Sequence, residues 1–105
     1  MEKMTSENMG KTLEMINSFF EENQIARKHS CFVDKNYLIF LMGSRENYEG
    51  AEICMNVNNV YTGTVNGDLI VRDITGTALE FSWLDGIRYK SGACWVVLYD
   101  TREKE

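Results

Sequence analysis

Hydrophobic residues change their spacing near residue 30, which divides the chain into a helical part and a β-rich part. Before the change, apolar side chains recur every three or four residues, as on one face of a helix: Met9, Leu13, Ile16 and Phe20. This spacing predicts an amphipathic helix over 6–24. Thr5 or Ser6 can cap its N-terminus, because a hydroxyl oxygen there accepts a backbone N–H bond.

After residue 30 the apolar positions alternate with polar ones, in short runs separated by turn dipeptides. Asn66-Gly67 is the strongest of these signals, since both residues tolerate the positive φ of a tight hairpin turn. It predicts a hairpin between strands at 60–65 and 68–73. In the last predicted strand, 93–100, simple alternation places three aromatic or branched side chains on one face: Trp95, Val97 and Tyr99.

These elements predict an α+β fold in which one N-terminal helix packs on a strongly bent antiparallel sheet of five to seven short strands. With 105 residues, one domain spanning 1–105 is expected, with a β-rich part at 30–100 and a frayed tail at 101–105. In layout, the run from Val60 to Val71 resembles small barrels of the SH3-like and Sm-like kind. A helix packed on an open antiparallel sheet explains the same pattern equally well.

Composition narrows the function classes. The net charge of −5 opposes direct nucleic-acid binding, which needs basic residues to neutralise phosphates. No apolar run is long enough for a transmembrane helix, so no membrane contact is expected. The first residues lack the basic-then-apolar order of a signal peptide, and a cytoplasmic location is therefore expected.

Motifs for catalysis or metal binding are weak. Three widely spaced cysteines and a single histidine do not match a zinc ligand set, and reduced buried thiols are expected for Cys31, Cys54 and Cys94. Because His29 and Cys31 are two residues apart, they would share a face of a strand and could form a Cys–His pair. The Gly10–Thr12 segment ends like a phosphate-binding loop but lacks the preceding glycine and strand. No catalytic residue, metal or cofactor is predicted.

Acidic residues concentrate in the middle of the β-rich part. Residues 46–87 contain seven acidic and one basic residue, a net charge of −6. An acidic surface with aromatic anchors is one way to bind a basic protein groove. The candidate contact residues are Tyr48, Glu49, Glu52, Tyr61, Asp68, Asp73, Trp83 and Asp85. Trp83 also shares a strand face with Leu79 and Phe81, so a core position is an alternative for it.

The resulting hypothesis is a small acidic, non-enzymatic binding protein. It would act as an inhibitor or antidote that blocks a basic, nucleic-acid-binding site on a partner protein, as phage anti-defence proteins (anti-CRISPR proteins among them) and immunity proteins do. The alternative is a module that sequesters a small molecule or nucleotide, with a pocket between helix and sheet or at a homodimer interface.

Overall fold

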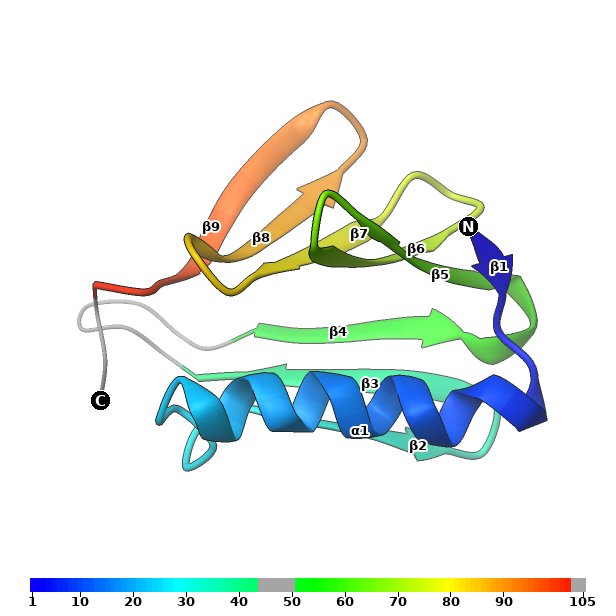
Figure 1. Cartoon of the computed structure of the whole chain (residues 1–105). Helices are drawn as coiled ribbons and strands as arrows, with labels where there is room; N and C mark the ends of the chain where they lie inside the picture. The colour runs from blue at the N-terminus through cyan, green and yellow to red at the C-terminus, as the bar shows by residue number, and fades with distance from the viewer. Residues whose placement is uncertain (44–50, 103–105) are drawn as a thin grey trace.

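The computed structural model describes residues 1–43 and 51–102 and arranges them in two layers (Figure 1). One layer is a six-stranded antiparallel sheet in the order β1-β5-β6-β7-β8-β9. The other contains helix α1 beside the three-stranded antiparallel sheet β2-β3-β4. In chain order the elements are β1 (Glu2–Lys3), α1 (Ser6–Glu22), β2 (Ser30–Asp34), β3 (Tyr37–Met42), β4 (Ala51–Asn56), the 3-10 turn η1 (Val57–Asn59), β5 (Val60–Val65), β6 (Asp68–Asp73), β7 (Ala78–Ser82), β8 (Gly86–Ser91) and β9 (Cys94–Asp100).

The predicted helix is confirmed, and its ends have clear local causes. Thr5 is the N-cap: its Oγ1 accepts the Asn8 backbone N–H at 3.4 Å, while Asn8 Oδ1 accepts the Thr5 N–H at 2.7 Å. The helix ends at Glu22, two residues before the predicted boundary. Gln24 then takes a left-handed φ of 63°, which a continuing helix does not allow.

The predicted hairpin at Asn66-Gly67 is also confirmed. Val65 pairs with Asp68, so the loop contains two residues, and their φ angles are 53° and 87°. Two successive positive φ angles are those of a type I′ turn, whose twist matches that of the flanking strands.

The predicted number and arrangement of strands are wrong in detail. The described residues form nine strands in two sheets, where five to seven strands in one bent sheet were expected. Two causes can be named: η1 interrupts the chain between β4 and β5, and the two-residue strand β1 is too short to leave a periodic signal. The barrel expectation is not confirmed, because the described residues form no closed barrel.

A bulge corrects the predicted faces of the last strand. Ile87 pairs with Tyr99 and Arg88 with Val97, so Leu98 is an extra residue in β9. Tyr99 therefore points into the core beside Ile87, whereas Trp95 and Val97 lie on the outer face of the sheet. Simple alternation had placed all three on one face.

Aromatic rings join the two layers into one core. Phe19 and Phe20 of α1 lie 5.5 and 6.1 Å from Phe81 of β7, measured between ring centroids, and Phe40 of β3 lies 6.1 Å from the same ring. All four rings are fully buried. The helix stripe predicted from the sequence thus packs on the inner face of the six-stranded sheet, and the three-stranded sheet packs beside it. Within the described ranges, no helix has the length and apolar character needed to cross a membrane.

The three cysteines differ in exposure, which corrects the expectation that all are buried. Cys31 is buried, and burial raises the pKa of its thiol to about 12, but Cys54 and Cys94 are exposed. The pKa of Cys54 is also raised, first by partial desolvation and then by the neighbouring Glu52 carboxylate, which accepts the S–H at 3.6 Å. A Cys31 thiolate is thus disfavoured near neutral pH, which argues against a reactive Cys–His pair with His29.

Alkylation of the folded protein at pH 8 should therefore modify Cys54 and Cys94 and spare Cys31, because the thiolate is the reactive form. Peptide mass spectrometry before and after denaturation would measure this. Labelling of Cys31 in the folded protein at the rate seen in denaturant would show that its surroundings are described wrongly.

Candidate functional site

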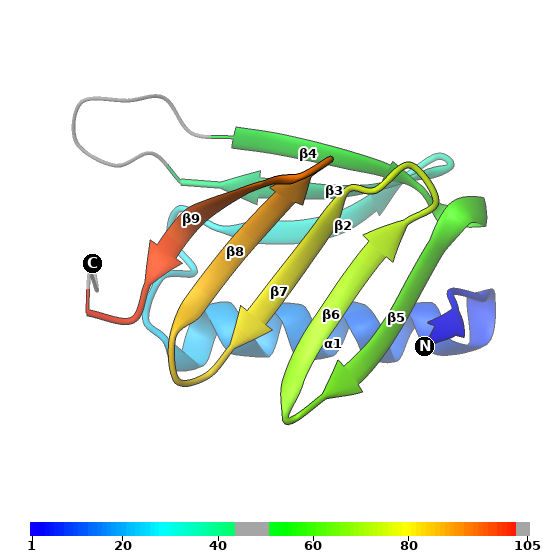
Figure 2. The same ribbon diagram turned by 90° about the horizontal axis from the view of Figure 1, so that it is seen from above.

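The outer face of the six-stranded sheet is the main candidate surface. Both α1 and the three-stranded sheet lie on the other side, so the described part of the chain leaves this face open (Figures 1 and 2). Alternate residues of each strand point inward and form the core: Val60, Leu69, Val71, Leu79, Phe81 and Ile87. The residues between them form an exposed surface of charged, aromatic and small side chains.

Acidic side chains gather at one corner of this face, around a hollow of about 330 Å³. Asp68 begins β6, Glu80 and Ser82 lie on β7, and Asp85 lies in the turn that follows. Arg88 of β8 also lines the hollow, and its guanidinium donates to Glu80 Oε2 at 3.0 Å. We call Asp68, Glu80, Ser82 and Asp85 the acidic corner.

The turn between β7 and β8 adds apolar groups beside the acidic corner. Leu84 is 82% exposed, and Trp83 is 43% exposed. Trp83 packs edge-on against the buried ring of Phe19 at 4.9 Å, and its indole N–H donates to Glu22 Oε2 at 2.6 Å. Trp83 thus combines the two roles that the sequence left open, because one part of the ring is anchored to the core and another part is exposed.

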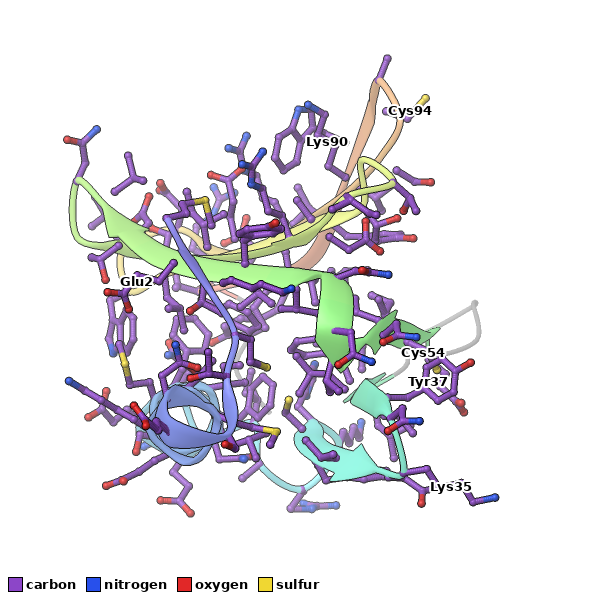
Figure 3. The ribbon with its side chains drawn as sticks, turned by 90° about the vertical axis from the view of Figure 1, so that its right-hand side faces the viewer. Glu2, Lys35, Tyr37, Cys54, Lys90 and Cys94 are labelled. Carbon is purple, nitrogen blue, oxygen red and sulfur yellow. The ribbon has the colours of Figure 1, made fainter. Side chains whose placement is uncertain are left out.

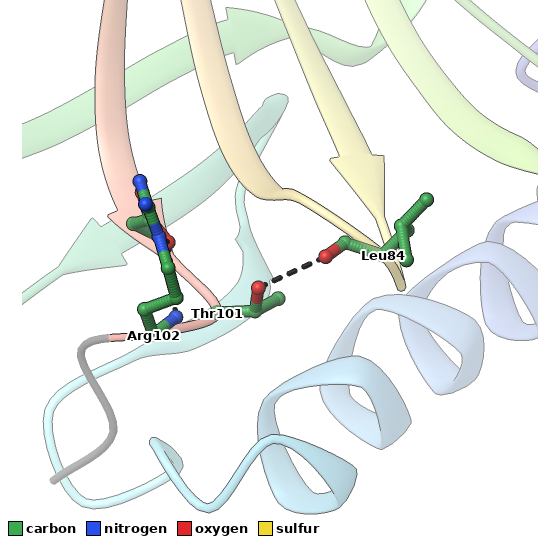
Figure 4. A network of polar contacts seen from close by, with 4 residues as sticks. Leu84, Thr101 and Arg102 are labelled. Atoms are coloured by element: carbon green, nitrogen blue, oxygen red, sulfur yellow. Dashed lines mark hydrogen bonds and ion pairs between the residues drawn. The ribbon is translucent and has the colours of Figure 1, made fainter.

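This turn is held from both sides. Ser82 Oγ accepts the Asp85 backbone N–H at 3.1 Å. From the end of β9, the Thr101 hydroxyl donates to the Leu84 carbonyl at 2.9 Å (Figure 4). The Thr101 N–H also donates to the Asp85 carbonyl at 3.2 Å. At the start of the tail that was predicted to fray, these two bonds hold Thr101, and Arg102 is paired with Asp100. The fraying stays a prediction, and residues 103–105 lie outside the described residues.

The other predicted contact residues are dispersed. Glu52 lies on the three-stranded sheet, opposite Leu41. Asp73 is used in a turn, where its carboxylate accepts the backbone N–H groups of Thr75 and Thr77 at 2.9 and 3.2 Å. Tyr61 is on the outer face, but it pairs with Arg72 at the end of the sheet away from the acidic corner. Tyr48 and Glu49 lie outside the described residues.

From the predicted set, the structure brings Asp68 and Asp85 together around one hollow, to which it adds Glu80 and Ser82. Trp83 is close in sequence, but its side chain lies against α1 and lines a different hollow with Lys11 and Glu14. The alternation within 77–84 places Glu80 and Ser82 on the face opposite Leu79 and Phe81, but their neighbours on β6 follow only from the register. Leu84 had no sequence signal of its own, because a single leucine before Asp85-Gly86 is equally compatible with the core.

A second hollow, of about 340 Å³, lies between the first turns of α1 and the edge of the sheet. The helix contributes Asn8, Lys11 and Thr12, and the sheet contributes Thr62 and Thr64. Thr12 donates its hydroxyl proton to the Asn8 carbonyl at 3.0 Å, as a side chain inside a helix does. The Gly10–Thr12 segment is therefore part of an ordinary helix, as the sequence predicted.

Among the residues that the structure describes, no group of three or more His, Cys, Asp or Glu side chains is arranged to hold a metal ion. No protein-family model, curated protein or solved structure matches this chain.

Proposed function

We propose that this protein is a non-enzymatic binding protein that occupies a basic site on a partner protein, as an inhibitor or antidote does. The observation that carries the proposal is the acidic corner, where three carboxylates from separate elements surround one hollow beside the exposed Leu84. Arg88 offsets the charge of Glu80, so Asp68 and Asp85 supply the net negative charge of the corner. A phage anti-defence protein or an immunity protein directed at a nucleic-acid-binding effector would use such a surface.

Charge and apolar contact have different roles in this proposal. Carboxylates opposite basic side chains speed association and select the partner. Binding energy comes mostly from a few well-packed side chains near the centre of an interface. Leu84 can supply such a contact, since it is exposed and directly precedes Asp85 in the turn.

The hydrogen bonds that hold the turn also favour binding. Thr101 and Ser82 fix the backbone of Leu84 and Asp85 before any partner arrives. A surface that is already ordered loses less conformational entropy when it binds. The acidic corner is thus suited to a partner with a rigid basic groove.

A charge-reversal pair tests the proposal. The variant Asp68→Lys/Asp85→Lys should lose the partner that the tagged wild-type protein captures from its source cells, with affinity lowered at least about 10-fold, because like charges now face each other. The control Glu21→Lys/Asp34→Lys makes the same change in net charge at two exposed positions away from the acidic corner and should retain the partner. Equal capture by both variants would contradict the proposal.

Salt provides an independent readout on the purified pair. Association should slow as ionic strength rises above about 0.15 M, where the Debye length falls to about 8 Å and below. Dissociation should change less, because it depends on the packed apolar contacts. An association rate that does not depend on salt would indicate that the partner does not bind at the acidic corner.

A second candidate function is sequestration of a small molecule or nucleotide in the hollow between α1 and the sheet. Its volume falls within the usual range of ligand pockets, and Lys11 supplies a cation at its rim. A ligand released by heating the purified protein, whose binding is lost in Lys11→Gln, would favour this candidate. If heating releases no small molecule, this second candidate function is contradicted.

A further inference from the structure

The sheet register places a row of cationic and aromatic side chains across all six strands. Each residue of this row is the direct cross-strand partner of the next. The row lies on the outer face and contains Lys3, Tyr61, Arg72, Ala78, Lys90 and Trp95. We call it the cationic row. Figure 3 shows Lys90 projecting from this outer side, away from Lys35, which lies in the turn between β2 and β3.

A cationic side chain lies over each aromatic ring of the cationic row. The guanidinium carbon of Arg72 lies 5.8 Å from the centre of the Tyr61 ring. Lys90 Nζ lies 5.5 Å from the Trp95 ring centre, and the guanidinium carbon of Arg88 lies 4.5 Å from it. Trp95 is still 43% exposed. Arg72, Ala78 and Lys90 lie between the two rings in the row, and Ala78 at its middle has a small side chain.

The local charge of the cationic row is opposite to that of the whole chain. Its six residues include three cations and no carboxylate, although the chain has a net charge of −5. Glu80 occupies the neighbouring outer row, where Arg88 pairs with it at 3.0 Å and offsets its charge. An anion that approaches the row therefore meets Lys3, Arg72 and Lys90 first.

We propose that the cationic row binds single-stranded nucleic acid. Aromatic rings that stack with bases and cations that contact phosphates are the two features that such surfaces combine. In the cationic row, Trp95 is exposed and Tyr61 is half-buried. Neighbouring strands are about 4.8 Å apart, so the four steps from Tyr61 to Trp95 span about 19 Å, enough for several nucleotides. This inference goes beyond the proposed function and does not depend on it. It revises the expectation from net charge, because the cations are collected on one surface.

A single strand fits this surface better than a duplex. Bases within a duplex are stacked on each other, and their faces are not available to Tyr61 or Trp95. An acidic protein segment could satisfy the cations but would leave the two rings without a stacking partner. The aromatic residues therefore decide between the occupants.

The test is a titration of a fluorescein-labelled ten-nucleotide oligo(dT) with the full-length protein, followed by anisotropy. With three cations engaged, the logarithm of the binding constant should fall with a slope of about −2 against the logarithm of salt concentration, which is roughly a 20-fold loss between 50 and 200 mM. The variant Arg72→Gln/Lys90→Gln should bind more weakly, with a slope of about −0.7. The control Arg27→Gln/Lys35→Gln removes the same charge at exposed positions outside the row and should match the wild type.

The stacking of bases on Trp95 is tested by separate variants and by tryptophan fluorescence. Trp95→Ala should weaken oligo(dT) binding roughly 10-fold, and Trp95→Phe should restore most of it. In a Trp83→Phe background, Trp95 is the remaining tryptophan, and oligo(dT) should quench its fluorescence. Circular dichroism melting curves establish that each variant is folded.

Three results would overturn the proposal. The first is no oligo(dT) binding at 50 mM salt with about 100 µM protein, the weak limit of non-specific binding. The second is equal affinity of wild type and Arg72→Gln/Lys90→Gln. The third is binding of a ten-residue poly-glutamate peptide, or of a ten-base-pair duplex, at least as tightly as oligo(dT), which would make the cationic row a general anion surface. These results are independent of the charge-reversal experiment, because neither Asp68 nor Asp85 belongs to the row.

Discussion

Replacing Phe20 with alanine is expected to lower the free energy of unfolding by about 3–5 kcal/mol. The Phe20 ring is fully buried and lies 6.4 Å from Phe19, 6.1 Å from Phe81 and 5.6 Å from His29, measured between ring centroids. Its removal leaves a cavity at the junction of α1 with the sheet. Because a domain of this size is stable by only about 5–15 kcal/mol, the loss should be clear in denaturant unfolding.

Phe32→Ala is the matched control. Phe32 is 40% exposed on the three-stranded sheet, so the same truncation removes fewer buried contacts. Its effect should be about 1 kcal/mol or less. If the two variants unfold at the same denaturant concentration, the packing of α1 on the sheet has been assigned wrongly.

Replacing Gly86 with alanine should destabilise the fold by about 3 kcal/mol or more, since two effects add. The φ angle of Gly86 is 120°, which side chains rarely adopt and which costs about 1–3 kcal/mol. In addition, a Cβ at this position would overlap the carbonyl group of Tyr99. The strand β8 could then not remain beside β9 at this point, and the turn that presents Asp85 would shift.

Gly76→Ala separates the two effects. Gly76 has a similar φ of 94°, but nothing lies within 4 Å of a Cβ built there. It should therefore cost only the backbone strain, and Gly86→Ala should be the more destabilising of the two in thermal or denaturant unfolding. Equal effects would mean that the close approach to Tyr99 relaxes without loss.

Local patterns in the sequence predicted the parts of the fold that have local causes. The apolar spacing of α1 and the Asn66-Gly67 turn both depend on residues within a few positions of each other, and both are confirmed. The division into two sheets depends on how η1 redirects the chain after β4, and three residues of mixed character carry little periodic signal. The bulge at Leu98 is another case, because one extra residue reverses the face of Tyr99 without changing the local composition.

The candidate surfaces required the register of the whole sheet. Asp68 and Asp85 were predicted as contact residues from charge alone, and the structure places both around one hollow. Asp73 is an aspartate of the same acidic segment, but its carboxylate accepts hydrogen bonds from Thr75 within the turn after β6. The cationic row is built from β1, β5, β6, β7, β8 and β9 and could not be seen in any single segment. Segment 46–87, with its net charge of −6, contains Arg72, and the structure places this cation in the row.

The central claim is that the register separates the charges of an acidic chain into distinct surfaces, and the two tryptophans report on it. Both are 43% exposed, but Trp83 is bonded to Glu22, whereas Trp95 lies beside Arg88 and Lys90. Fluorescence quenching by iodide and by caesium should be compared in Trp83→Phe and Trp95→Phe proteins, because charged quenchers concentrate near opposite charge. The account predicts a clearly higher iodide-to-caesium quenching ratio for Trp95 than for Trp83, with the difference shrinking in high salt. Equal ratios at low salt, or a higher ratio for Trp83, would contradict it.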